Sequence, residues 1–141
     1  MLDTKLGLIV VYTLMVLPIV IWIMRDQFNA IPLELEQAAQ VDGASIWVAF
    51  TRIVLPIALP GMVAAFILSV VLCWNEYFFA ALLTSTDAKT LPVMVASQTG
   101  SQGIDWWSMA ALSTAAIAPL VLIGIFLERY IVKGLTAGAI K

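Results

Sequence analysis

The segment Leu35–Pro60, LEQAAQVDGASIWVAFTRIVLPIALP, decides the fold, because it is the one long stretch that is not membrane-like and it separates two apolar runs. Pro32 suits the first turn of a helix, so residues 33–41 are predicted to form a short helix. Asp42-Gly43 should end that helix, since glycine adopts the left-handed conformation found at helix ends. Ser45 then caps a second helix with one apolar face. That face is made by Ile46, Trp47, Phe50, Ile53 and Val54.

Pro56 lacks the N–H that the second helix would need, so we expect this helix to end there. The segment is therefore predicted to be two short helices that lie along a membrane surface. Gly43 forms the exposed elbow between them. We use "elbow" below for the turn Asp42–Ala44.

The motif around this elbow resembles a known one. Gln37-Ala38-Ala39, Gly43, Ile53 and Leu55-Pro56 are spaced as in the EAA loop of permease subunits of binding-protein-dependent ABC importers. The resemblance implies a cytoplasmic coupling loop, about 32–60, that docks on an ATP-hydrolysing subunit. Implied ATPase contacts are Glu36, Gln37, Ala38, Ala39, Asp42, Gly43 and Ala44, and implied loop supports are Ile53, Leu55 and Pro56.

The acid of the family motif is replaced by Gln37 in this chain. In the family, this acid is expected to pair with a basic residue of the ATPase. Two alternatives follow: Glu36 takes over the pairing, or the contact is neutral.

Composition indicates an all-α integral membrane protein, since 62% of the 141 residues are hydrophobic and only 11% are charged. The net charge of −2, without any run of basic residues, argues against a nucleic-acid partner. The chain has no histidine and one cysteine, Cys73, which excludes an intrachain disulfide and leaves no basis for a zinc or haem site. We expect no cofactor and no metal.

Three transmembrane helices are predicted at about 6–24, 62–83 and 108–127, because each run is close to the ~20 apolar residues that cross a bilayer. A signal peptide is the rival interpretation of the first run, which follows Lys5. It is disfavoured because no small-residue cleavage site follows and Arg25 comes directly after the run.

Glu76 is the one ionisable side chain predicted near membrane depth, so an enzyme site has too few acid/base groups and we expect no enzymatic activity. Glu76 could line a translocation path together with Trp74 and Asn75, because a carboxylate is costly in lipid. It could equally be an interfacial acid among aromatic anchors. Trp74-Asn75-Glu76 resembles the corresponding helix of sugar permeases, which favours the translocation path.

The polar connection 84–107 is predicted to be a loop outside the membrane. In maltose-type permeases the equivalent loop faces the solute-binding protein. Residues 128–141 are expected to form a tail that includes a short flexible segment from Gly134. Its end resembles the tails of carbohydrate permeases, which can touch the ATPase.

Positive charge predicts the orientation, because basic residues concentrate in cytoplasmic loops. Two basic residues, Lys5 and Lys89, fall on one side, and five fall on the other: Arg25, Arg52, Arg129, Lys133 and Lys141. The elbow and the C-terminus are therefore expected in the cytoplasm of a bacterial cell, with the N-terminus of this chain outside the inner (plasma) membrane.

The resemblance covers the C-terminal half of a six-helix permease, so three upstream helices are expected to be missing. It implies these partners: two ATP-binding ABC subunits, a second permease subunit, an external solute-binding protein and membrane lipid. The implied cargo is a carbohydrate, and Gln98-Thr99-Gly100 with Trp106-Trp107 most resembles sorbitol and mannitol permeases, which favours a polyol. Open alternatives are another small solute, a small membrane scaffold, or a non-functional truncated fragment.

Overall fold

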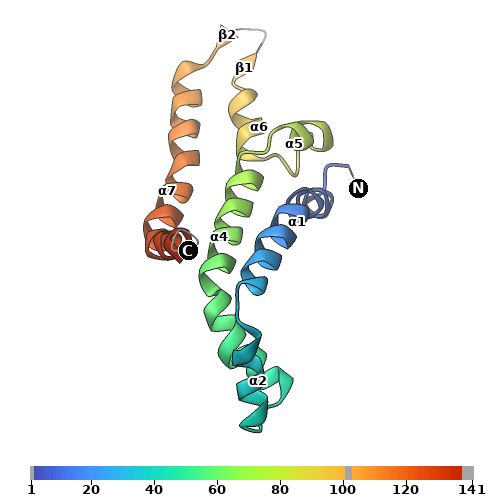
Figure 1. The fold of residues 1–141 in the computed structure, drawn as a ribbon. Coiled ribbons are helices and arrows are strands. Elements are labelled where there is room, and N and C mark those ends of the chain that lie inside the picture. Colours follow the sequence, from blue (N-terminus) through green and yellow to red (C-terminus); the bar gives the residue numbers. More distant parts are fainter. Residues whose placement is uncertain (1, 101–102, 138–141) are drawn as a thin grey trace. The chain divides into compact units, whose positions relative to one another are not determined.

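The computed structural model describes residues 2–100 and 103–137 and is almost entirely helical (Figure 1). The elements are α1 (Lys5–Asn29), α2 (Leu33–Val41), α3 (Ile46–Ala49), a π-helical turn η1 (Phe50–Val54), α4 (Leu55–Trp74), α5 (Phe78–Leu83), α6 (Leu91–Ala96), β1 (Thr99–Gly100), β2 (Gly103–Ile104) and α7 (Trp106–Ala137). The two strands pair antiparallel as a short hairpin.

Three of these helical segments are long and apolar enough to cross a membrane: Lys5–Asn29, Ile46–Trp74 and Trp106–Leu127. This confirms the predicted all-α membrane class with three spans. Most large apolar side chains of the spans are exposed, such as Trp22 at 74% and Phe126 at 73%. Such side chains suit contact with lipid or with other helices, since they would be unfavourable in water.

The predicted end of the second helix at Pro56 is wrong. Helix α3 continues through the π-helical turn into α4, so that the second candidate span begins at Ile46, well before the predicted residue 62. The Leu55 N–H donates to the Phe50 carbonyl, five residues earlier. Pro56 follows at the point where hydrogen bonding returns to the α-helical spacing, so its missing N–H falls where the ladder is already interrupted.

The predicted continuation of this span to residue 83 is also wrong, because α4 ends at Trp74 and α5 is a separate helix. The Asn75 side-chain amide donates to the Val71 carbonyl at 2.8 Å, in competition with the backbone ladder. The Glu76 carboxylate then accepts from the N–H groups of Phe79 and Ala80 at 2.8 and 3.1 Å, and thereby starts α5.

Two further predictions need correction. The connection 84–107 is not only loop, because it contains α6, the two paired strands and the first two residues of α7. The flexible segment predicted from Gly134 is helical as far as Ala137, since a single glycine costs a helix only about 1 kcal/mol. Residues 138–141 of that segment lie outside the described residues.

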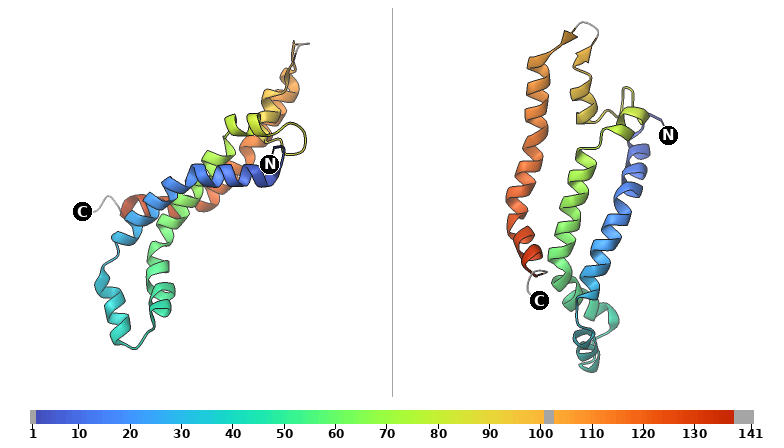
Figure 2. Two further views of the ribbon diagram at one scale, coloured as in Figure 1. Left: turned by 90° about the vertical axis from the view of Figure 1, so that its right-hand side faces the viewer. Right: turned by 45° about the horizontal axis from the view of Figure 1, so that its top comes forward.

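The chain divides into two compact units, each with its own contacts. The first unit comprises the residues up to Leu17 together with Ser69–Phe126, and the second comprises Pro18–Leu68 with the chain from Leu127 on. In the first unit, the core is built on buried Leu8, Ala80 and Ala88. Figure 2 shows the start of α1 beside α5, and small buried alanines allow such close packing.

Candidate functional site

The elbow in the second unit is a Schellman motif, which is the hydrogen-bond pattern that commonly ends a helix at glycine. Gly43 N–H donates to the Gln40 carbonyl at 3.0 Å, and Ala44 N–H donates to the Ala39 carbonyl at 2.9 Å. Gly43 has φ +86°, in the left-handed region, and a Cβ added there would meet nothing within 4 Å. Glycine is therefore favoured by the backbone conformation, and any side chain at this position would project outward.

Ser45 caps the next helix as predicted, since its hydroxyl oxygen accepts from the Val48 N–H at 3.4 Å. Helix α2 packs against α3 and the π-helical turn, and this arrangement buries Ala39 of the motif. Gln37 and Ala38 are exposed, whereas Glu36 is half-buried. The motif thus has an inward-facing alanine and an outward-facing edge formed by Gln37 and Ala38.

An apolar surface surrounds the elbow. Val41 is 87% exposed, Ile46 74% and Trp47 75%. The predicted single apolar face is in fact divided, because Val54 is buried while Ile46 and Trp47 point outward. Phe50 packs against the rings of Trp47 and Phe28, with centroids 6.3 and 6.4 Å apart. We call Val41, Ile46 and Trp47 the elbow patch.

The three predicted loop-supporting residues lie where the π-helical turn joins α4. Ile53 and Leu55 are half-buried, and Pro56 is exposed. Since α3, the π-helical turn and α4 follow one another without a break, these residues lie in a continuous helical segment.

The predicted translocation-path residues lie in the first unit, around the break between α4 and α5. The Trp74 indole N–H donates to the Ala116 carbonyl of α7 at 3.0 Å, one turn before Pro119. Glu76 uses its carboxylate to cap α5, and its backbone carbonyl accepts from the Tyr12 hydroxyl at 3.5 Å. Glu76 therefore has a local structural role that neither sequence interpretation anticipated.

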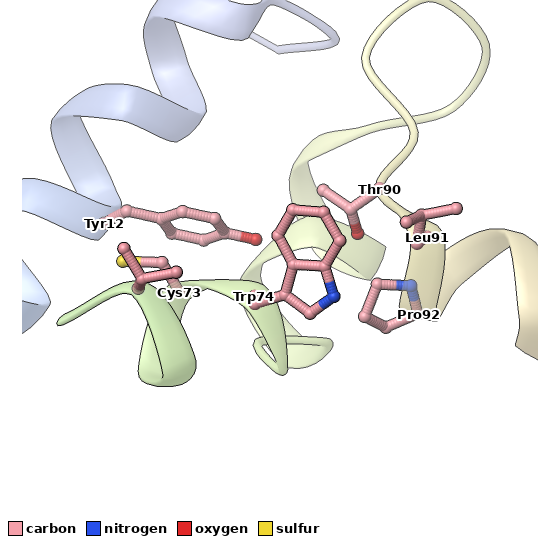
Figure 3. A pocket seen from close by; sticks show the side chains of 7 residues that line it. Tyr12, Cys73, Trp74, Thr90, Leu91 and Pro92 are labelled. Atoms are coloured by element: carbon pink, nitrogen blue, oxygen red, sulfur yellow. The ribbon is translucent and has the colours of Figure 1, made fainter. Parts of the chain in front are cut away.

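Trp74 separates two cavities of the first unit. One, of about 540 Å³, is lined by Tyr12, Val70, Cys73, Trp74, Thr90, Leu91 and Pro92. Figure 3 shows the side chains that line it. The other, of about 430 Å³, lies between Trp74 and α7, with Asn75, Tyr77 and Ser113 among its polar lining.

Asp3 forms a polar site that sequence reasoning missed. Its carboxylate accepts hydrogen bonds from the backbone N–H groups of the four consecutive residues 85–88 and from the hydroxyls of Ser85 and Thr86, at 2.8–3.3 Å. The Asp3 N–H donates to the Leu83 carbonyl. We call this arrangement the Asp3 clasp; it ties the start of α1 to the α5–α6 connection. The Ser85 and Thr86 hydrogen bonds hold the pKa of Asp3 well below its usual range.

Asp105 performs a similar task for α7. Its carboxylate accepts from the Ser108 hydroxyl at 2.6 Å and from the Ser108 N–H at 3.2 Å, and these bonds lower the pKa of Asp105. The cap fixes the helix start, where Trp106 and Trp107 are 65% and 89% exposed. Exposed tryptophans at the end of a span are typical of a membrane interface.

We expect Asp3→Asn to loosen the clasp. An amide has one acceptor oxygen instead of two, and its NH2 group would face the N–H donors of residues 85–88. Amide hydrogen exchange of residues 85–88 should accelerate, whereas Asp87→Asn, which removes the same charge nearby, should leave it unchanged. Because the pKa of Asp3 is lowered in the folded protein, the stabilisation that the clasp gives is complete above about pH 3.9, the ordinary aspartate value. It is lost as the pH falls through the lower pKa of the folded state. Equal exchange in both variants would show that the clasp is not stabilising.

The comparison with protein families gives one match that covers residues 1–137, to the family described as "Binding-protein-dependent transport system inner membrane component". The chain belongs to this family. It is thus a multi-pass membrane component of a transport system, and its family is one of permeases, not of enzymes. The elbow motif, recognised in the sequence from its residues and their spacing, lies within the matched residues.

Relatives of this permease component include the trehalose/maltose transport system permease protein of Thermococcus litoralis, 38% identical over 99% of the chain. The trehalose transport system permease protein of Mycobacterium tuberculosis is 39% identical over 99% of the chain. The diacetylchitobiose uptake system permease protein of Streptomyces coelicolor is 33% identical over 100% of the chain. The chain spans 51%, 52% and 51% of the lengths of these three proteins, respectively.

The structure brings the predicted coupling residues together in the second unit, on α2, the elbow and the π-helical turn. It places Trp74, Asn75 and Glu76 in the first unit, where Trp74 lines both cavities and bonds to α7, Asn75 lines the smaller cavity, and Glu76 lines neither. Sequence reasoning assigned no role in a cavity to Tyr12 or Thr90, which line it beside Trp74 from other parts of the chain. No local motif marks Tyr12.

Proposed function

We propose that this chain acts as a permease subunit of an ATP-driven carbohydrate importer and couples to the ATPase subunit through the elbow. The observation that carries the proposal is the glycine turn at φ +86° with the exposed elbow patch around it. Exposed apolar side chains in this number mark an interaction surface. Membership of a binding-protein-dependent transport family supports the same assignment.

The chemistry of the elbow suits a protein groove. The elbow patch supplies apolar anchors, and Trp is among the residues that contribute most to interfaces. Beside it are the exposed Asp42 and Gln37 and the half-buried Glu36. We propose that Gln37 makes a neutral contact with the ATPase, because it is the more exposed of the two candidates, and that Glu36 supplies the charge at the edge of the groove.

Coupling would be mechanical. The elbow leads into α3, and α3 continues through the π-helical turn into α4 without a break. A displacement imposed on the elbow by ATPase closure would therefore be passed into the start of the span. The π-helical turn is a suitable place for bending, since π-turns are a known cause of helix kinks and are frequent at functional sites.

The proposed orientation places the elbow in the cytoplasm and the hairpin outside. Arg25 and Arg52 lie within the first two candidate spans, towards the ends next to the elbow, whereas Lys5 begins the first span and Lys89 follows the second. The hairpin and Trp106-Trp107 would then face an external solute-binding protein. A second permease subunit and two ATPase subunits complete the proposed assembly.

The proposed cargo is a carbohydrate, which is supported by relatives named for trehalose, maltose and diacetylchitobiose. Within this class, resemblance of residues 98–100 and 106–107 to sorbitol and mannitol permeases favours a polyol. Because relatives are named for the transport of the disaccharides trehalose and maltose, these sugars are the second candidate cargo.

The test is ATP hydrolysis by the assembled importer in proteoliposomes, with the solute-binding protein and one candidate sugar at a time. We expect a carbohydrate to stimulate hydrolysis, with sorbitol or mannitol more effective than trehalose or maltose. Stimulation by a disaccharide alone would correct the cargo and leave the carbohydrate class in place. Stimulation by none of these sugars, but by an unrelated small solute, would overturn the carbohydrate proposal.

A further inference from the structure

The larger cavity of the first unit is assembled from three elements that are distant in sequence. Tyr12 comes from α1, Trp74 and Cys73 from the end of α4, and Thr90 and Pro92 from the start of α6. Its volume of about 540 Å³ lies within the range of about 300–1,000 Å³ that is usual for small-molecule sites. In Figure 3 the Trp74 indole stands between the Tyr12 hydroxyl on one side and Thr90 and Pro92 on the other.

The lining of this cavity is mostly apolar, but it includes two residues with hydroxyl groups, Tyr12 and Thr90. Thr90 Oγ1 is buried and has no hydrogen-bond partner within the described residues. Buried hydroxyls are rarely left in that state, so the Thr90 hydroxyl is expected to pair either with the nearby Tyr12 hydroxyl or with a ligand. The Tyr12 hydroxyl donates only over 3.5 Å to the Glu76 carbonyl, which is the long end of the hydrogen-bond range. It is therefore available to a closer acceptor.

The Trp74 indole has a fixed orientation, because its N–H donates to the Ala116 carbonyl at 3.0 Å. This hydrogen bond occupies the polar N–H of the ring, and the flat aromatic face is left to contact a ligand. The Trp74 indole thus presents a flat, electron-rich face next to two hydroxyls. This arrangement is complementary to a ligand ring or chain that has C–H groups on one face and hydroxyls at its edge.

We propose that this cavity binds one sugar unit of the cargo, with its C–H face against Trp74 and its hydroxyls hydrogen-bonded to Thr90 and Tyr12. The inference rests on the proposed carbohydrate transport and assigns its binding site on this chain. A lipid acyl chain is the competing occupant, but it would offer neither hydroxyl a hydrogen-bond partner. Of the three predicted path residues, Trp74 lines this site, whereas Asn75 and Glu76 do not.

Cys73 provides a direct probe, since it lines the cavity and is the one cysteine of the chain. The assembled importer in nanodiscs would be treated with a small maleimide, and modification of the Cys73 peptide would be followed by mass spectrometry with and without sorbitol, trehalose or maltose. Sugar at about ten times its Kd should slow modification about tenfold, because only the unoccupied cavity reacts.

Variants separate the contacts. Trp74→Ala should raise the sugar concentration for half-protection about tenfold, and Trp74→Phe should restore much of the protection, because it keeps an aromatic face. Thr90→Val, which replaces the hydroxyl with a methyl group, should weaken protection several-fold. Trp22→Ala is the matched control: Trp22 is 74% exposed and does not line the cavity, so protection should be unchanged.

Several outcomes would overturn the inference. One is a Cys73 that reacts at the same rate with and without sugar while the sugar still stimulates ATP hydrolysis, which leaves the proposed function standing. A second is protection by an alkyl detergent but by no sugar, which assigns the cavity to an acyl chain. A third is a Cys73 that never reacts, which shows a closed cavity. If sugars neither protect Cys73 nor stimulate ATP hydrolysis, both the binding site and the proposed carbohydrate function are overturned.

Discussion

Replacing Gly43 with aspartate should abolish retention of the ATPase by the purified permease assembly while leaving the three spans intact. The new side chain would meet nothing within the chain, so its carboxylate would project from the elbow beside Val41 and Trp47. An unpaired charge in the middle of an interface costs about 2 kcal/mol or more, which corresponds to about thirtyfold in Kd. Co-purification of the ATPase with a tagged permease chain, followed by sugar-stimulated ATP hydrolysis, measures the effect.

Two variants control for backbone strain and for charge. Gly43→Asn introduces a side chain of the same size without the charge, and asparagine tolerates the left-handed conformation about as well as aspartate does. It should therefore retain more ATPase than Gly43→Asp.

Gly103→Asp is the matched control for a charged side chain at a left-handed glycine, since Gly103 has φ +113° and also open space around an added Cβ. It lies in the hairpin of the first unit and should keep full ATPase binding. If the Gly43→Asp permease retains as much ATPase as the wild type, the proposed coupling through the elbow is contradicted. Loss in both aspartate variants would indicate a general defect in folding.

Local chemistry explains why the elbow could be predicted from sequence. The bounds of α2, the left-handed Gly43 and the Ser45 cap each depend on residues within a few positions of one another. The failure at Pro56 has a different origin. A π-helical turn changes the hydrogen-bond spacing without changing the pattern of apolar residues, so hydrophobic periodicity contains no sign of it.

Distance along the chain explains what could not be predicted. The Asp3 clasp joins residues that are 82–85 positions apart, and Asp3 looks like any polar residue ahead of a span. The cavity beside Trp74 likewise needs Tyr12 and Thr90 from separate helices. Glu76 was singled out because a carboxylate is rare in an apolar run, but its role in capping α5 depended on where α4 ends.

The second large effect is expected at Gly61, a buried glycine of α4 that faces Gln27 of α1 within the second unit. A Cβ at position 61 would lie 2.6 Å from both Cγ and Cδ of Gln27. Gly61→Ala should therefore displace the end of the Gln27 side chain, and it forces the two helices apart only where their packing leaves that side chain no other rotamer. Overpacking costs about 1–3 kcal/mol, and the better helix propensity of alanine returns about 1 kcal/mol, so the net loss of stability should be up to about 2 kcal/mol.

A double-mutant cycle identifies the cause of that loss. Gln27→Ala removes the atoms that collide, so the pair Gly61→Ala with Gln27→Ala should recover most of the thermal stability in detergent. Gly124→Ala is the matched control in α7, where an added Cβ meets nothing within 4 Å, and its stability should be unchanged or raised by about 1 kcal/mol. If Gly61→Ala is as stable as Gly124→Ala, or if Gln27→Ala gives no recovery, α1 and α4 do not pack through this glycine. Full recovery would establish that α1 and α4, the long helices on either side of the elbow, pack against each other through this glycine.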